Sequence, residues 1–267
     1  MVQLANKIGG VVLSFVDHPA KGPVDRPTLI IAHGLFGSAR NWGVIARRLA
    51  DRRRVAAVDM RNHGVSPWFA THSYADMAED LAEVIGAIGA PVDMLGHSMG
   101  GKAAMQLALS AGGLLRRLVI ADIAPIAYGH DQSQHIRSMR GVNLAGLESR
   151  GEADRRLAET LPDAALRAFF LQSLDLKAQP PEWRLNLDVL EAEMAKIVGW
   201  PGTKGQFDGR VLFLTGSESA YVKAEYRPEI VALFPKARFA KLIGAGHWLH
   251  AEQPREFEET VRVFLDA

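Results

Sequence analysis

Six short apolar runs, separated by segments with helical periodicity, constrain the fold of this chain more than any other feature of its sequence. Several runs are apolar almost throughout, which is typical of parallel strands that are covered on both faces. Their alternation with helical segments predicts βαβ units in a mostly parallel, doubly wound sheet of the α/β class. The runs are TLIIAHG (28–34), RVAAVDM (54–60), VDMLGHS (92–98), RLVIADIAP (117–125), RVLFLTG (210–216) and ARFAKLIGAG (237–246).

Two parts of the chain depart from this alternation. The early run GGVVLSFVDHP is predicted to pair at an edge of the sheet, as part of a hairpin. Residues 126–206 contain no convincing strand, and their helical pattern is interrupted by prolines. We therefore predict a core built from residues 1–125 and 207–267. Residues 126–206 would form a helical cap, inserted after the strand that ends near Asp122.

Length and composition limit the classes of protein to consider. The chain has 267 residues, enough for one sizeable core, and is 48% hydrophobic and 23% charged, as globular proteins are. A net charge of +1 predicts no recruitment of nucleic acid or of an acidic membrane. The absence of cysteine excludes disulfides and thiolate chemistry. The start of the chain lacks the pattern of a signal peptide and no apolar run is long enough to span a membrane, so we expect a cytoplasmic protein.

The stretch Gly96-His97-Ser98-Met99-Gly100 matches G-x-S-x-G and stands between a predicted strand and a predicted helix. This context is typical of a nucleophile elbow, a sharp turn that projects a serine above the sheet. The two glycines remove side chains that would clash in such a turn. We expect Ser98 at a helix N-terminus, where N–H groups favour developing negative charge. The alternative is a glycine-rich turn with an incidental serine.

The same stretch begins the pattern of a phosphate-binding loop. Residues Gly96 to Lys102 fit G-x-x-x-x-G-K, but Ala103 stands where such a loop needs Ser or Thr to bind Mg²⁺. The missing ligand argues against nucleotide binding, and we predict no metal site.

One of the nine histidines is well placed to act as a base for this serine. A serine hydroxyl is a weak nucleophile and needs a base, most often histidine. His247, in GAGHWLHAEQP, follows the last predicted strand on a glycine-rich loop and precedes the last helix. From there it can reach the carboxyl end of the sheet, where Ser98 is expected.

The loop HGLFG (33–37), after the first parallel strand, is the candidate for half of an oxyanion hole. A backbone N–H from this loop would act together with the N–H of Met99. Backbone donors place little constraint on side chains, so Leu35 is the first choice and Phe36 the alternative.

Five stretches of the chain together carry a resemblance to a known family. HGLFGSARNW, VDMRNHGVS, YADMAEDL, LGHSMGGKAAM and GAGHWLHAEQP resemble the α/β-hydrolase superfamily, and more narrowly the small YbfF-type bacterial esterases and their mitochondrial relatives. The resemblance implies a serine hydrolase with a helical cap, acting on esters or thioesters without a cofactor. Ser98 carries over as nucleophile and His247 as base. The chain departs from the family's Arg-Gly-His-Gly at Asn62, which tolerates left-handed backbone and should preserve the turn.

The acid that would orient the histidine has two candidates. Most α/β-hydrolases place it after the penultimate strand, where this chain has the neutral Ser219, one residue from Glu218. Asp122 instead ends an apolar run, where a buried carboxylate needs a partner. Some family members take the acid from this strand, and the YbfF-type sequences share the Asp-x-Ala-Pro found here. We favour Asp122 and keep Glu218 as the alternative.

These residues predict transfer of an acyl group to water through an acyl-enzyme on Ser98. The expected partner is a small-molecule ester or thioester with a short to medium acyl chain. Alternatives on the same scaffold are a cofactor-free haloperoxidase or perhydrolase, a C–C hydrolase, or a ligand-binding protein that retains the triad. Five aromatic residues are candidates for the acyl pocket: Phe36, Phe169, Phe170, Tyr221 and Trp248.

Overall fold

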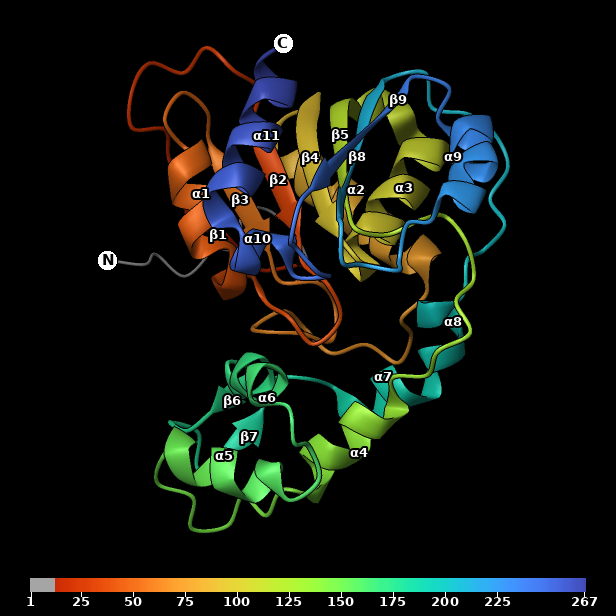
Figure 1. The fold of residues 1–267 in the computed structure, drawn as a ribbon. Coiled ribbons are helices and arrows are strands. Elements are labelled where there is room, and N and C mark those ends of the chain that lie inside the picture. Colours follow the sequence, from red (N-terminus) through yellow and green to blue (C-terminus); the bar gives the residue numbers. More distant parts are fainter. Residues whose placement is uncertain (1–12) are drawn as a thin grey trace.

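A seven-stranded sheet forms the centre of the computed structural model, which describes residues 13–267 (Figure 1). Its strands lie in the order β1-β3-β2-β4-β5-β8-β9, and every neighbouring pair is parallel except β1 with β3. The mostly parallel sheet predicted from the alternating apolar runs is therefore confirmed. The strand bounds are β1 Phe15–His18, β2 Leu29–Ala32, β3 Val55–Val58, β4 Val92–His97, β5 Leu115–Ala121, β8 Arg210–Gly216 and β9 Ala237–Leu242.

Strand β1 lies at an edge of the sheet, as expected, and pairs antiparallel with β3. It does not pair with β2, the next strand in the chain, because both edges of β2 are taken, by β3 on one side and by β4 on the other. A hairpin between β1 and the residues that precede it stays a prediction. Residues 9–12 of the predicted run lie outside the part of the chain that the structure describes.

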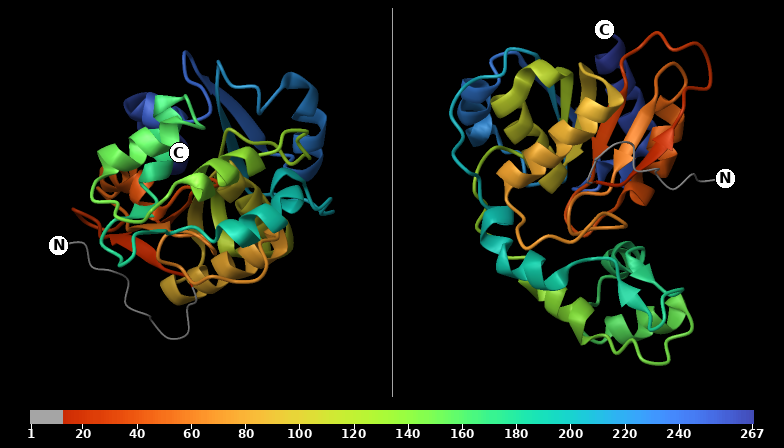
Figure 2. Two further views of the ribbon diagram at one scale, coloured as in Figure 1. Left: turned by 90° about the horizontal axis from the view of Figure 1, so that it is seen from below. Right: turned by 180° about the vertical axis from the view of Figure 1, so that it is seen from behind.

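Helices cover both faces of the sheet (Figures 1 and 2). Along β2, Ile30 packs into the cluster that includes α2, α3 and α9, while Leu29 and Ile31 pack into the cluster that includes α1 and α11. Burial on both faces explains why the strands appear in the sequence as continuous apolar runs. The core helices are α1 Gly43–Leu49, α2 Tyr74–Ile88, α3 Met99–Ala111, α9 Arg227–Leu233, α10 Leu249–Glu252 and α11 Pro254–Asp266, with 3-10 helices η1 Ala39–Trp42, η2 Gly112–Leu114 and η3 Ala224–Tyr226.

The inserted segment, residues 126–206, leaves the sheet after β5, returns to it at β8, and forms a separate lobe in Figures 1 and 2. Its strands β6 and β7 pair antiparallel outside the main sheet, so the expectation of no strand here is wrong. Strands of two residues are too short to give a detectable sequence period. The elements are α4 Ser133–Gly141, α5 Arg150–Ala158, α6 Ala164–Leu171, β6 Leu174–Asp175, β7 Glu182–Trp183, α7 Leu187–Ala192 and α8 Met194–Val198.

None of the helices within residues 13–267 is both long and apolar enough to cross a bilayer. The location expected from the sequence stays a prediction.

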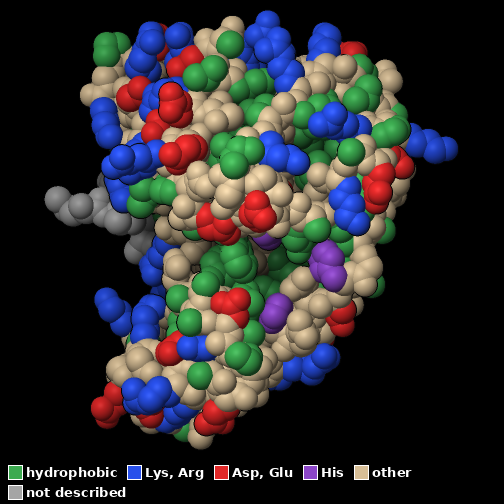
Figure 3. Space-filling view, in the orientation of Figure 1, with side chains coloured by type: hydrophobic (Ala, Val, Ile, Leu, Met, Phe, Trp, Pro, Cys, Tyr) green, Lys and Arg blue, Asp and Glu red, His purple; other side chains and the backbone are tan. Residues whose placement is uncertain are grey.

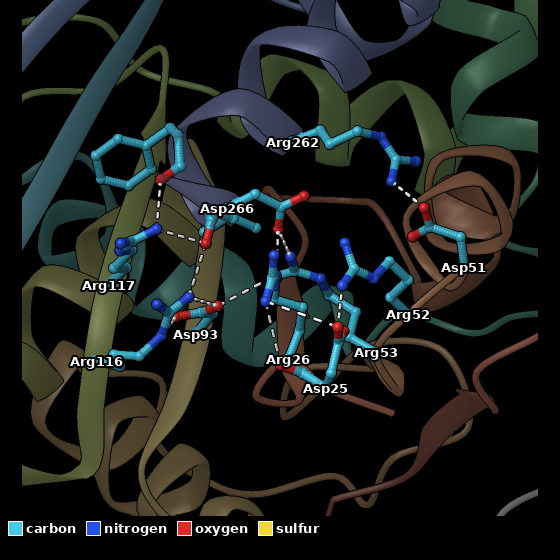
Figure 4. A network of polar contacts seen from close by, with 12 residues as sticks. Asp25, Arg26, Asp51, Arg52, Arg53, Asp93, Arg116, Arg117, Arg262 and Asp266 are labelled. Atoms are coloured by element: carbon cyan, nitrogen blue, oxygen red, sulfur yellow. Dashed lines mark hydrogen bonds and ion pairs between the residues drawn. The ribbon is translucent and has the colours of Figure 1, made fainter. Parts of the chain in front are cut away.

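The amino end of the sheet, away from the inserted segment, carries a network of arginine and aspartate side chains (Figure 4). Asp93 in β4 is fully buried, and it accepts hydrogen bonds from Arg53 (3.0 Å to Oδ2) and from Arg116 (2.8 Å to Oδ1). Arg53 also pairs with Asp266 at the end of α11. The network therefore fastens the last helix to the beginning of the central strands.

Candidate active site

Ser98 lies between β4 and α3 in a strained backbone conformation, with φ of +51°. Only glycine fits two positions before it and two positions after it. A Cβ on Gly96 would lie 2.4 Å from the carbonyl oxygen of Gly100, and a Cβ on Gly100 would lie 2.4 Å from that of Ala32. The surrounding chain thus holds the strain in place and sets the Ser98 hydroxyl at the N-terminus of α3.

Ser98, His247 and Asp122 form a continuous line of hydrogen bonds although they come from distant parts of the chain. The Ser98 hydroxyl lies 3.1 Å from Nε2 of His247, and Nδ1 of His247 lies 2.7 Å from Oδ2 of Asp122. His247 sits in the loop between β9 and α10, and Asp122 directly follows β5. With its proton on Nδ1 donated to the carboxylate, the imidazole can accept the serine proton at Nε2.

Three donors satisfy the fully buried carboxylate of Asp122. Oδ1 accepts a hydrogen bond from the N–H of Gly216 at 3.2 Å, and Oδ2 accepts from His247 and from the hydroxyl of Ser219. The residue itself has a left-handed φ of +52°, and its N–H donates to the carbonyl of Leu214 at 2.9 Å. Sequence reasoning treats Ser219 only as a neutral residue where an acid is usual, and so misses that it binds the acid.

Glu218, the alternative acid, takes no part in this line of hydrogen bonds. Its side chain is exposed, and its carboxylate accepts from the hydroxyl of Ser217 at 2.9 Å. Within residues 13–267, no hydrogen bond joins the Glu218 carboxylate to His247. The structure therefore brings Asp122, and not Glu218, to the histidine.

The ring and loop of His247 are held from both sides. Tyr221 stacks on the ring, with centroids 3.9 Å apart and planes at 19°. The hydroxyl of Tyr128 donates to the carbonyl of Tyr221 at 2.7 Å and accepts the N–H of Ala124 at 2.9 Å. From the other side, Nε2 of His97 donates to the carbonyl of His247 at 2.9 Å. The sequence indicated Tyr221 only as a pocket residue, and its contact with the imidazole is new.

Two backbone N–H groups beside Ser98 have no acceptor among the described residues. Met99 begins α3, and the first N–H groups of a helix have no intrahelical partner. In the loop after β2, the N–H of Leu35 is likewise without an acceptor in residues 13–267. The N–H of Phe36, in contrast, donates to Nε2 of His63 at 3.2 Å. Of the three N–H groups considered for the oxyanion hole, those of Met99 and Leu35 are thus the two without an acceptor in residues 13–267.

The histidines behind this loop are buried and neutral. Burial lowers the pKa of His33 to about 4 and the pKa of His63 to about 3. Each ring also accepts a backbone N–H at Nε2. His33 accepts the N–H of Met60 at 3.0 Å, and His63 accepts the N–H of Phe36. These two rings are hydrogen-bond partners that fix loops, and they do not carry protons at neutral pH.

A cavity of about 340 Å³ lies beside Ser98, walled by both the core and the inserted segment. Figure 3 shows histidine and hydrophobic side chains gathered in a hollow between these two parts. The volume is in the range of small-molecule sites. Among the residues that the structure describes, none that line the cavity is Asp or Glu. The lining includes all five aromatic candidates for an acyl pocket: Phe36, Tyr221 and Trp248 from the core, and Phe169 and Phe170 from the inserted segment.

Lys102 also lines this cavity, although the sequence singled it out only as part of a phosphate-loop pattern. Its side chain is buried, and Nζ donates to the carbonyls of Val198 (3.0 Å) and Gly199 (2.5 Å) and lies 4.7 Å from the ring centroid of Tyr128. Burial lowers the pKa of Lys102 to about 7. The amino group thus binds the chain where it leaves α8, a contact that accounts for the lysine without a phosphate.

Comparison with known proteins gives a consistent set of relatives. Residues 29–260 match the profile of the alpha/beta hydrolase family. The chain is 37% identical over 253 residues to the sn-1-specific diacylglycerol lipase ABHD11 of Mus musculus, covering 91% of this chain and 82% of that protein. It is 37% identical over 242 residues to esterase YbfF of Escherichia coli strain K12, covering 89% of this chain and 92% of that protein. A solved marine microorganism esterase superposes with a TM-score of 0.89 at 33% identity, covering 96% of this chain and all (100%) of that one.

Proposed function

This chain belongs to the α/β-hydrolase family, and from that premise we propose that it hydrolyses carboxylic esters or thioesters through an acyl-enzyme on Ser98. The family resemblance seen in the sequence motifs is confirmed, and so is the expectation of an esterase-type hydrolase. The proposal for the mechanism rests on one observation, the line of hydrogen bonds from Ser98 through His247 to Asp122.

In the first half of the proposed reaction, Oγ of Ser98 attacks the carbonyl carbon while its proton passes to Nε2 of His247. Asp122 stabilises the imidazolium that forms. The tetrahedral intermediate collapses, its carbon–oxygen or carbon–sulfur bond breaks, and the leaving alcohol or thiol takes the proton from His247. In the second half, His247 removes a proton from water, which attacks the acyl carbon. The bond between that carbon and Oγ of Ser98 then breaks, His247 returns the proton to Oγ, and the carboxylic acid leaves.

The oxyanion of both intermediates would be bound by the N–H groups of Met99 and Leu35. Phe36, the alternative donor, is less suitable because its N–H already donates to His63. The positive end of α3 adds to the same stabilisation, since Ser98 stands at its N-terminus.

The inserted segment is proposed to act as a lid that shapes the acyl pocket. Phe169 and Phe170 reach the cavity from this segment, opposite Phe36, Tyr221 and Trp248 of the core. A cavity of about 340 Å³ with this aromatic lining suits a short to medium acyl chain. The lipase relative supports a second substrate class, diacylglycerols, which the same serine chemistry would cleave.

The test is hydrolysis of p-nitrophenyl butyrate by the wild type, Ser98→Ala and a matched control, Ser217→Ala. Ser217 lies in an exposed loop and bonds Glu218 and Gly244. We expect Ser98→Ala to lose on the order of 10⁴-fold or more in kcat, as loss of a triad serine does elsewhere. The Ser217→Ala rate should match the wild type. A fluorophosphonate should label the wild type once per chain and leave Ser98→Ala unlabelled.

Two outcomes would count against the proposal. Turnover that survives in Ser98→Ala would exclude an acyl-enzyme on this residue. A wild type that hydrolyses neither short and medium p-nitrophenyl esters, nor acyl thioesters, nor a diacylglycerol would exclude the esterase function.

A further inference from the structure

The loop that carries the proposed oxyanion donor is a strained turn. The N–H of Gly37 donates to the carbonyl of Gly34 at 3.0 Å, which places Leu35 and Phe36 at the two central positions. Phe36 has a φ of +63°, a value that glycine normally provides at the second central position of such a turn. A non-glycine residue keeps this conformation only when its surroundings hold it there.

Two hydrogen bonds hold the backbone of Phe36 on either side. Its N–H donates to Nε2 of His63 at 3.2 Å, and its carbonyl accepts from the hydroxyl of Ser173 at 3.0 Å. All three residues are buried, with exposed fractions of 3% for Phe36, 0% for His63 and 4% for Ser173. Ser173 lies between α6 and β6, so the inserted segment supplies one of the two bonds.

The inserted segment also binds the turn that carries His63. Arg184 lies next to β7. Its carbonyl accepts the N–H of Gly64 at 2.9 Å, and its N–H donates to the carbonyl of Ser173 at 2.8 Å. The hydrogen bonds therefore form a closed path from Phe36 to Ser173, Arg184, the His63 turn and back to Phe36. Both bonds that hold the strained residue depend on the same part of the inserted segment.

Side chains around this path strengthen the contact. The ring of Phe170 meets the ring of Phe36 edge to face, with centroids 5.3 Å apart. Beyond the turn, Nδ2 of Asn41 donates to Oε1 of Gln172 at 2.6 Å. Phe170, Gln172 and Ser173 thus contact the loop of residues 33–37 and the 3-10 helix η1 that follows it.

We propose that Ser173 is a positioning residue for the oxyanion hole, through which the inserted segment holds the Leu35 N–H in its reactive orientation. The inference rests on the proposed function, because it needs Leu35 to bind the oxyanion. Without the Ser173 hydroxyl, the carbonyl of Phe36 loses its buried donor and the turn can relax toward a conformation without positive φ. The inserted segment then contributes to the chemical step as well as to the fit of the substrate.

The experiment compares Ser173→Ala, Ser173→Thr and Ser173→Val with the wild type. Threonine and valine have the same shape and differ only in the hydroxyl, so this pair separates the hydrogen bond from packing. Glu193→Ala is the control, since Oε2 of Glu193 accepts the N–H of His72 at 3.3 Å and so ties the inserted segment to the core away from the loop. Rates are normalised to competent enzyme by titration with a fluorophosphonate.

Two readouts distinguish positioning from a general structural role. The first is kcat and KM for p-nitrophenyl acetate, which is too small to depend on the fit of an acyl chain. The second is inhibition by trifluoroacetone, a ketone to which Oγ of Ser98 adds while its proton passes to His247, leaving an oxyanion in the hole. We expect Ser173→Ala and Ser173→Val to lower kcat roughly 10- to 100-fold, to leave KM unchanged and to raise the inhibition constant by the same factor as kcat falls. Ser173→Thr and Glu193→Ala should stay near the wild type.

The proposal is overturned if Ser173→Val matches Ser173→Thr, or if kcat falls without a parallel rise in the trifluoroacetone constant. A change confined to KM would assign Ser173 to substrate fit alone. Failure of the proposed function has a different signature: turnover would persist in Ser98→Ala, or the wild type itself would hydrolyse none of the esters and thioesters, whatever residue stands at position 173.

Discussion

Two fully buried carboxylates stand at opposite ends of the sheet and differ in what holds them. At the amino end, Asp93 binds the guanidinium groups of Arg53 and Arg116 (Figure 4). At the carboxyl end, Asp122 accepts hydrogen bonds from a backbone N–H, a hydroxyl and the imidazole of His247. Arginine is always protonated, so the partners of Asp93 never change their charge.

In the proposed mechanism the partner of Asp122 changes its charge, and this difference separates a carboxylate that serves only the fold from one that serves the reaction. When His247 takes the proton of Ser98 in that mechanism, Asp122 gains a positive neighbour that was not there before. The buried negative charge thus favours the transition state over the resting state. Asp93 has no such step available and stabilises only the fold.

Among changes to the two carboxylates, Asp122→Asn has the largest expected effect, and the effect falls on the rate. An amide cannot hold the imidazole in the required tautomer, and in a Ser-His-Asp triad this substitution lowers kcat about 10⁴-fold. Initial rates with p-nitrophenyl butyrate measure the loss. Glu218→Gln is the matched control, because it removes a carboxylate from the neighbouring loop and should leave kcat unchanged. If Glu218→Gln loses kcat while Asp122→Asn retains it, Glu218 and not Asp122 is the acid of the triad.

Asp93→Asn should show the opposite pattern, with a weaker fold and an unchanged site. It removes one of the two carboxylates that pair with the buried guanidinium of Arg53, and because Asp266 remains as a partner we expect a cost of about 1.5–3 kcal/mol. Urea unfolding measures the free energy, and kcat is measured well below the unfolding midpoint. If the folded Asp93→Asn variant loses kcat to the extent that Asp122→Asn does, Asp93 does not serve the fold alone and the comparison between the two carboxylates is wrong.

Acid should lower the free energy of unfolding mainly through histidines at the carboxyl end of the sheet. The effect of each histidine per pH unit should be smaller than the effect of Asp93→Asn. Burial lowers the pKa of His33 to about 4 and that of His63 to about 3, so between these values and about 6.5 the unfolded chain binds more protons than the folded one. The free energy of unfolding should therefore fall as the pH drops below about 6.5, by up to ~1.4 kcal/mol per pH unit for each histidine. Urea unfolding across this range checks the slope. His63→Gln should make the slope shallower. Asp93→Asn should not, because burial raises the pKa of that carboxyl and its contribution to the slope has the opposite sign to that of the histidines.

Features set by a few adjacent residues could be predicted from the sequence. Continuous apolar runs indicated the buried parallel strands, and Gly96 and Gly100 indicated the turn that now proves too crowded for any other residue. An aspartate at the end of an apolar run indicated a carboxylate in need of partners, and Asp122 has them. In each case the physical reason operates within one strand or one turn.

Features that depend on two distant segments could not be predicted in this way. The hydroxyl of Ser219 on Asp122, the ring of His63 on the N–H of Phe36 and the pairing of β1 with β3 each require the relative placement of separate loops. The residue types involved are compatible with many other contacts. Ser173 gave no signal in the sequence, since one serine in a helical segment has no local reason to bind a loop of the core.

The inserted segment has a consequence for how such proteins diversify. It leaves and rejoins the sheet between β5 and β8, which are neighbours, so its length can vary without altering the register of any strand. This favours exchange of whole lids during evolution, or by grafting in the laboratory. If a lid must also present a hydroxyl to the carbonyl of Phe36, a transplanted lid that fits the substrate well would still give a slow enzyme until that single group is restored.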